Sequence, residues 1–156
     1  MNLQEGRWTA ELDGDFVVFM LGAAVHDPAV ATEASELLLA MTDMLAELEQ
    51  DPSMGLLAYS VYGAPSGVIV QYWRSFEALE EYARNPAATH APVWRRWNRL
   101  ASDDRGGAGI WHETFKVTAG SYEAVYQNMP LMGLQKAGRP VTVTESRDTA
   151  RARIGD

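Results

Sequence analysis

Cysteine is absent from the sequence of 156 residues. Its absence excludes thiol nucleophiles, cysteine-ligated zinc, iron–sulfur clusters and disulfide bonds as functional elements. Any nucleophile or base must therefore come from another side chain. A chain without cysteine is also compatible with a reducing compartment.

Basic residues and long apolar runs are scarce as well. The 13 Lys and Arg are outnumbered by 21 Asp and Glu, which gives a net charge of −8 at pH 7. Nucleic-acid binding depends on clustered basic residues, so we expect no nucleic-acid partner. The longest apolar run covers residues 16–25, short of the roughly 20 residues that cross a bilayer, so we expect no membrane partner. The N-terminal segment is acidic where a secretory signal would be basic, and we therefore expect a cytoplasmic protein.

The sequence has the length and apolar content of one globular domain. Hydrophobic residues make up 47% of the chain, enough for a core that needs no disulfide bond or metal. No internal repeat or linker divides the chain, but large apolar residues become rare after Pro140. We therefore expect one domain over residues 1–140, with an extended N-terminal arm, and a polar, mobile tail over residues 141–156.

Hydrophobic periodicity predicts alternating strands and helices. Apolar residues at intervals of three and four between Val30 and Leu48 predict a long amphipathic helix, which begins at Asp27-Pro28 and ends before Pro52. Runs of β-branched and aromatic residues predict strands, and capping residues and prolines delimit two further helices. The predicted strands cover residues 7–12, 15–25, 55–62, 67–73, 110–117 and 122–129, and the predicted helices cover residues 28–51, 75–84 and 93–101.

The order of these elements is strand, helix, strand, strand, helix, strand, with an extra extended arm at each end. This order is typical of the ferredoxin-like split βαβ arrangement, an α+β fold in which helices cover one face of a four-stranded antiparallel sheet. The second face needs a cover of its own, either the sheet of another subunit, in a homodimer with a barrel-like interior, or the terminal arms. The strands offer more apolar surface than one layer of helices can cover, through Tyr59, Val61, Val68, Val70, Tyr72, Trp73 and Trp111.

No motif for phosphate, dinucleotide or metal binding is present, nor a nucleophile elbow, so candidate chemistry depends on single residues. His90 precedes Trp94 and Asn98 at spacings of four. These three side chains share one side of a helix if helical geometry extends back to residue 90, although Pro92 favours a loop there. His90 is able to serve as a proton shuttle, a substrate hydrogen-bonding group or a haem ligand; the alternative is a capping or surface histidine.

A second candidate cluster lies on the predicted strand over residues 110–117. Because successive strand residues alternate faces, His112 and Glu113 cannot both point into one cavity. Glu113 shares its face with Trp111 and Phe115, where apolar surroundings would raise its pKa and suit it to acid–base catalysis. The alternative is an ion pair between Glu113 and an arginine of the segment 95–99.

Three further polar residues are candidates for substrate binding. Tyr126 and Asn128 share a face of the last predicted strand and are able to hold the polar end of a ligand, although tyrosines at such a spacing are often packing residues. His26 lies between the first long strand and the long helix. That position is equally typical of a binding site and of an ordinary turn.

Four segments resemble a bacterial and fungal family described as monooxygenase-like. They are GDFVVFMLG, QYWRSFEALEEYARNPAATHAPVWRRWNR, GIWHETFKV and SYEAVYQNMPLMGL, and the resemblance extends from about Arg7 to Arg139. The family is similar to the dimeric α+β barrel superfamily, which includes cofactor-independent oxygenases, haem-degrading monooxygenases and haem-containing dehydratases. The resemblance therefore implies a dimeric α+β barrel and a small-molecule enzyme, and it implies the fold more firmly than the reaction.

The resemblance also implies site residues. His90 lies where many members of the superfamily carry a histidine. The chain departs from the family pattern at residues 23–27, where relatives carry an arginine and an asparagine followed by basic residues and a tryptophan. A polar strand residue that could orient the substrate is thus missing, and either His26 compensates or the substrate differs. The motif segments of the family include Trp73, Trp94, Asn98, Trp111, His112, Glu113, Tyr126 and Asn128.

These residues lead us to expect a cofactor-independent monooxygenase of secondary metabolism with an apolar or aromatic substrate inside the barrel. In this hypothesis His90 removes a proton from a phenol or enol, the anion reacts with oxygen, and Tyr126 and Asn128 hold the oxyanion. One alternative is a haem-dependent dehydratase or oxygenase with His90 as axial ligand, and another is a non-catalytic dimeric ligand-binding protein. The residues expected to exclude water are Trp73, Trp94 and Trp111.

Overall fold

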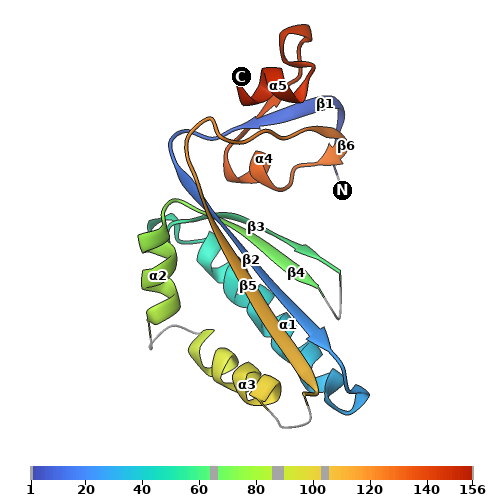
Figure 1. Ribbon diagram of the computed structural model, residues 1–156, viewed down its shortest axis with the longest axis vertical. Helices are drawn as coiled ribbons and strands as arrows, with labels where there is room; N and C mark the ends of the chain where they lie inside the picture. Colours follow the sequence, from blue (N-terminus) through green and yellow to red (C-terminus); the bar gives the residue numbers. More distant parts are fainter. Residues whose placement is uncertain (1, 64–66, 86–89, 103–105, 156) are drawn as a thin grey trace.

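The computed structural model describes residues 2–63, 67–85, 90–102 and 106–155, with the side chains of Glu47 and His90 outside this description. Two sheets follow one another along the long axis of the molecule (Figure 1). The larger has four strands in the order β3-β4-β2-β5, and the smaller has three strands in the order β6-β1-β7. Both ends of the chain lie in the part that contains the smaller sheet (Figure 1).

The larger part has the predicted split βαβ topology. Every pair of neighbouring strands is antiparallel, and β2 and β4 are the central strands. Two helices together occupy the place of the second helix of the motif. The fold is therefore α+β and ferredoxin-like, as predicted. The elements in chain order are β2 (Phe16–Val25), α1 (Ala31–Glu49), β3 (Leu56–Tyr62), β4 (Val68–Trp73), α2 (Phe76–Arg84), α3 (His90–Ser102) and β5 (Ala108–Val117).

Helix α1 forms where the periodicity predicts it. Asp27 accepts a hydrogen bond from the backbone N–H of Ala29 at 2.8 Å, and the short 3-10 turn η1 (Pro28–Val30) leads into the helix. The buried stripe of α1 packs on the sheet and consists of Ala34, Leu37, Met41, Leu45 and Leu48. None of the described helices combines the length and the apolarity that a bilayer-spanning helix needs.

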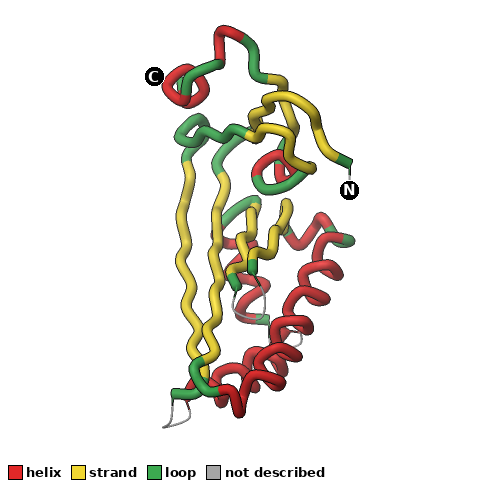
Figure 2. Tube along the Cα trace, turned by 90° about the vertical axis from the view of Figure 1, so that its right-hand side faces the viewer, coloured by secondary structure: helices red, strands yellow, loops and turns green. Residues whose placement is uncertain are grey.

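Helices α1, α2 and α3 lie on one face of the larger sheet, which we call the helix face (Figure 2). On β2, Val17 and Leu21 are buried beneath these helices. The alternate residues point the other way, and we call their side of the sheet the open face. Trp111 lies there against Gly22, where an added Cβ would come within 2.2 Å of the indole atom Cε2. Glycine at this position therefore lets the indole approach the backbone of β2.

Two boundaries differ from the predictions. Helix α3 begins at His90, before Pro92. Proline is tolerated in the first turn of a helix, because a backbone N–H at that position would have no intrahelical acceptor. The last predicted strand was placed over residues 122–129, whereas β6 spans Tyr126–Pro130. Tyr122 instead anchors a loop, because its hydroxyl accepts a hydrogen bond from Leu12 N at 2.6 Å and donates one to Leu12 O at 3.1 Å.

The smaller part joins the two ends of the chain. Strand β1 (Leu3–Glu11) pairs with β6 on one side and with β7 (Arg139–Thr142) on the other. The remaining helices are α4 (Leu134–Ala137) and α5 (Ala150–Ile154), and the 3-10 turn η3 (Glu145–Arg147) lies before α5. The segment predicted as a mobile tail thus contains regular elements.

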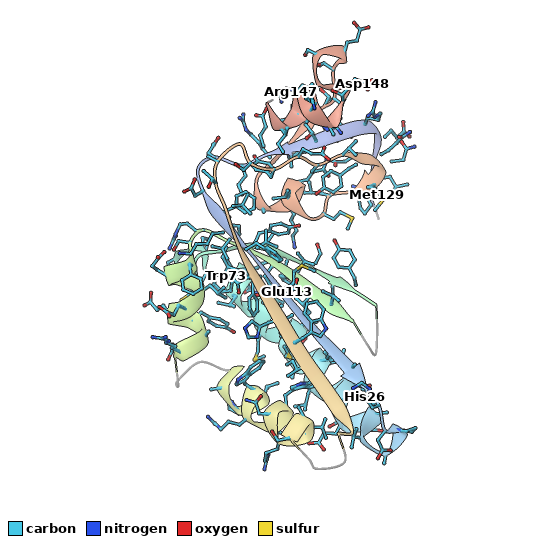
Figure 3. The ribbon with its side chains drawn as sticks, in the orientation of Figure 1. His26, Trp73, Glu113, Met129, Arg147 and Asp148 are labelled. Atoms are coloured by element: carbon cyan, nitrogen blue, oxygen red, sulfur yellow. The ribbon has the colours of Figure 1, made fainter. Side chains whose placement is uncertain are left out.

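Ion pairs tie the C-terminal segment to β1. The Glu11 carboxylate pairs with Arg147 and, at 2.5 Å, with Arg139, while Arg7 pairs with Asp148. Figure 3 shows Arg147 and Asp148 together at this end of the molecule. The hydrogen bond from Arg147 is the main cause that lowers the pKa of Glu11 from its ordinary value of 4.5.

We expect the C-terminal segment to loosen when Glu11 is neutralised. In a Glu11→Gln variant, trypsin should cleave after Arg147 and Arg151 faster than in the wild type, as mass spectrometry would detect. The lowered pKa means that the Glu11 contribution is complete above pH 4.5 and is lost as the pH falls through the lower folded-state value. Acidification below pH 4.5 should therefore accelerate cleavage by an acid-active protease in the wild type more than in the variant. Glu145→Gln, on the same segment, is the control, and equal cleavage of all three proteins would contradict the role of Glu11.

Candidate functional site

A cavity of about 310 Å³ lies between the helix face of the larger sheet and the helices. Strands β2, β4 and β5 supply its floor, and α1, α2 and α3 supply its walls. Its volume is at the lower end of the roughly 300–1,000 Å³ typical of small-molecule sites. The apolar lining residues are Phe19, Leu21, Met41, Met44, Leu45, Phe76, Leu79, Ala83 and Trp94.

Gln71 of β4 is the buried polar residue of the floor, with 5% of its surface exposed. Its Oε1 atom accepts a hydrogen bond of 2.9 Å from the indole Nε1–H of Trp73, two residues along the strand and on the same face. Trp73 is completely buried and lies behind the lining rather than in it. The sequence prediction placed Trp73 against the substrate, whereas the structure gives it contact with Gln71 and with the ring of Tyr82, at 5.6 Å between centroids.

His112 and Thr114 of β5 line the opposite side of the floor. The His112 ring lies 5.5 Å from the ring of Phe19, measured between centroids, and the two planes are tilted by 35°. Phe19 belongs to β2, which separates β5 from β4. The central strand therefore presents an aromatic ring, with Gln71 on one side of it and His112 on the other.

Charged and aromatic side chains, Tyr82 among them, complete the lining on the helix side. Glu80 and Arg84 of α2 form an ion pair of 2.8 Å one helical turn apart. Trp94 of α3 is 37% exposed and also lines the cavity. Trp94 therefore shares the cavity with His112, whereas the sequence prediction associated it with His90, whose side chain lies outside the described part of the structure.

Glu113 and Trp111 lie away from the cavity. Both point to the open face, as the alternation along β5 requires, and Trp111 is 41% exposed. Figure 3 shows Glu113 on β5. The alternative ion pair of Glu113 does not form within the described residues, where Arg96 pairs with Glu33 at 3.1 Å.

Tyr126 and Asn128 belong to the smaller sheet and do not line the cavity. The Tyr126 hydroxyl accepts a hydrogen bond from Leu134 N at 3.0 Å, and burial raises the pKa of this tyrosine above its ordinary value. Asn128 has φ of 53°, and its side-chain oxygen accepts a hydrogen bond of 2.9 Å from Gly6 N. That contact lies where the pairing of β1 with β6 is irregular, so Asn128 supports the backbone.

The remaining predicted residues are dispersed. His26 lies at the far end of β2, where its backbone N–H donates to Gly107 O at 2.9 Å (Figure 3). Asn98 is exposed on α3 and does not line the cavity. His90 is the first residue of α3, and its side chain lies outside the described part of the structure. Its role stays a prediction.

Sequence reasoning missed Gln71 and Thr114. Gln71 alternates with apolar residues on β4 and shares its face with Ile69 and Trp73, which are both buried. A glutamine between two buried residues of a central strand is a signal that could have been read. Thr114 has no such signal, because its place depends on the register of β5 against β2.

The fold and the cavity define a class of protein: a ferredoxin-like α+β domain with a small-molecule pocket between sheet and helices. Residues 16–134, which hold every described lining residue, match the model of the Monooxygenase af470-like family. The chain belongs to this family.

Individual relatives are distant. Monooxygenase af470 of Aspergillus fumigatus is 29% identical over 126 residues, which are 74% of this chain and 43% of that protein. The chain thus spans less than half the length of this curated relative. Among solved structures, a Bacteroides thetaiotaomicron protein of unknown function, described as a possible oxidoreductase, has a TM-score of 0.46 at 18% identity over 65% of this chain and 97% of its own. An antibiotic biosynthesis monooxygenase candidate from Chloroflexus aurantiacus has a TM-score of 0.36 at 18% identity over 68% and 96%.

We expect Asn128 to matter for stability and not for binding in the cavity. Asn128→Ala removes the acceptor for Gly6 N and places alanine at a left-handed φ, so the free energy of unfolding in urea should fall by about 1–3 kcal/mol. Asn128→Gly, which tolerates this φ, should lose less. Equal stability of the two variants would contradict a contribution from backbone conformation.

Proposed function

We propose that the protein is a small-molecule monooxygenase whose apolar or aromatic substrate binds in the cavity of about 310 Å³. The observation that carries this proposal is an apolar cavity with few polar groups in a member of a monooxygenase-like family. The volume of the cavity suits a substrate of one or two fused rings, and its aromatic and aliphatic lining suits an apolar one. Gln71, Thr114 and His112 offer hydrogen bonds from the floor.

The reaction we propose needs no cofactor. The imidazole of His112 takes the proton of a phenol or enol hydroxyl, and the resulting anion carries negative charge on a ring carbon. That carbon forms a bond with O₂ and becomes a hydroperoxide after protonation. Loss of water then leaves one oxygen atom as a carbonyl. The water carries away the hydrogen of that ring carbon and the former hydroxyl proton, and the substrate supplies the electrons.

We choose His112 as the base because its side chain lines the cavity. Its ring lies beside Phe19 in the cavity, whereas Glu113 points to the open face. His90, the base expected from the sequence, starts the helix that carries Trp94 one turn later. Substitution of His112 and substitution of His90 therefore test two different hypotheses about the base.

The described lining does not fit haem. The volume suits a ligand of one or two rings and is small for a macrocycle with its propionates. No step of the proposed reaction uses haem.

We also propose that a second copy of the chain covers the open face. The face carries Trp111, Phe115 and Tyr62 with exposed fractions of 41%, 48% and 43%, although large apolar side chains normally avoid such exposure in a cluster. The terminal arms gather around the smaller sheet at one end of the molecule (Figure 1). Figure 2 shows the long strands of the larger sheet with helices on one side and the terminal arms beyond their end.

We expect His112→Ala to lower the rate of oxygen consumption by on the order of 100-fold, because general-base catalysis contributes about that much. The measurement is oxygen uptake with a panel of phenols and naphthols. His26→Ala, which removes a histidine at the far end of β2, is the matched control and should keep the wild-type rate.

Parallel measurement of His90→Ala separates the two candidate bases. Loss of activity in His90→Ala with full activity in His112→Ala would transfer the role to His90. Ligand binding without oxygen uptake by any panel member would favour the non-catalytic alternative. A Soret band that survives desalting after addition of haemin would contradict the cofactor-free reaction.

We expect the wild type to elute as a dimer of 17.2 kDa chains and Trp111→Glu as a monomer. A carboxylate in place of the indole would lie desolvated between the two sheets, which is unfavourable. The measurement is size-exclusion chromatography with light scattering. Leu39→Glu, at a residue of α1 that is 66% exposed, is the control and should remain dimeric. A monomeric wild type would contradict the proposal.

A further inference from the structure

We propose that Gln71 determines the polarity of the ligand end that the cavity accepts, and that it selects a hydrogen-bond acceptor. The inference rests on the proposed role of the cavity as the substrate site. It concerns one side-chain amide, which lines the cavity and is 5% exposed. The required ligand end is a carbonyl oxygen or an oxyanion.

Trp73 fixes the orientation of this amide. An indole N–H donates and cannot accept, so its bond of 2.9 Å identifies the Gln71 atom facing it as the oxygen Oε1. The amide nitrogen Nε2 is left at the other end, and it donates to no group among the described residues. Rotation of the amide would leave the buried indole N–H facing an N–H₂ group, which costs the full penalty of an unpaired donor.

Most of the side chains that line the cavity with Gln71 are apolar. Phe19 lies directly across from Gln71 on β2, and Met44 and Leu45 of α1 and Leu79 of α2 line the helix side together with the ion pair of Glu80 and Arg84. A hydrogen bond to a ligand acceptor is stronger in a mostly apolar cavity than in bulk water. A ligand that presents its own donor would instead place two N–H or O–H groups against each other.

Gln71 and His112 define the two ends of the ligand. They lie on β4 and β5, which flank β2, and the pairing places His112 two residues further along the strands than Gln71. Two strand spacings and this offset separate their backbones by roughly 12 Å. One ligand atom therefore cannot contact both side chains, and Phe19 lies between them. The arrangement fits a flat, conjugated ring system on Phe19, with an ionisable hydroxyl near His112 and a carbonyl oxygen near Gln71. Removal of the proton at one end would then place negative charge on the oxygen that Nε2 holds.

Binding of two matched probes tests the selection without any reaction. 1-Tetralone carries a carbonyl acceptor and no donor, and tetralin has the same rings without the carbonyl. By isothermal titration calorimetry, the wild type should bind 1-tetralone roughly fivefold more tightly than tetralin, as expected for one neutral hydrogen bond. Gln71→Leu should bind the two probes equally.

Two further variants keep the test independent of folding defects. Gln71→Leu leaves the buried Trp73 N–H unpaired, so the double variant Gln71→Leu/Trp73→Phe removes both polar partners and should fold with little loss of stability. It should also lack the preference. Trp73→Phe alone keeps the amide but frees its rotation, and the preference should fall without a change in tetralin affinity.

Thr9→Val is the polar control, because Thr9 is as deeply buried as Gln71 but belongs to β1 and does not line the cavity. The preference for 1-tetralone should survive in this variant. Survival of the preference in Gln71→Leu would overturn the assignment while leaving the cavity as the binding site. Failure of the wild type to bind either probe would overturn the proposed function itself and the selection with it.

Discussion

The period of two along the central strands is the constraint on which the candidate site depends. The helices cover one face of the larger sheet, so each strand residue belongs either to the cavity and core or to the open face. On β5 this places His112 beside Phe19 and puts its neighbour Glu113 on the opposite side. A shift of β5 by one residue against β2 would exchange the two, and the cavity would then contain a carboxylate in place of the imidazole.

The ends of the chain are stabilised by a different interaction. Strand β1 has few buried residues, and its partners β6 and β7 are short. Besides the backbone pairing, ion pairs from Glu11 and Arg7 connect β1 to the C-terminal segment. Such exposed pairs are individually weak, but three of them on one strand hold the segment in one register. The net charge of −8 does not prevent this, because the arginines of the C-terminal segment are concentrated where the acidic partners lie.

The sequence predicted the larger sheet and its helices because periodicity reports burial directly. Helix α1 shows this best, since its apolar residues recur at intervals that place them on one side. The order of the elements was sufficient for the ferredoxin-like topology. The smaller sheet was not predicted, since it joins β1 to segments more than 100 residues away and no local pattern encodes that pairing.

The candidate site was predicted less well than the fold, because it also depends on pairing between segments that lie far apart in the sequence. Trp94 was singled out from its spacing to His90, and His112 from its place on a predicted strand beside Glu113. Trp94 and His112 both line the cavity. Tyr126 and Asn128 were chosen because alternation places them on one face, but alternation does not tell which sheet the strand joins. Gln71 stands out in the structure because its amide accepts a hydrogen bond from Trp73. That bond depends on the orientation of both side chains, which the pattern of residues along the chain does not report.

Two buried tryptophans explain why the cavity has its position. Trp73 on β4 packs within one core cluster under α2, and Trp97 on α3 packs within a second cluster against α1. Both are completely buried, so each fixes the separation of the elements that it joins. Trp97 lies one turn after Trp94 and therefore sets where Trp94 stands at the cavity, while Trp73 sets the amide of Gln71. The cavity borders the first cluster at Leu45 and Leu79, and large buried side chains outside the lining support Gln71 and Trp94, which belong to it.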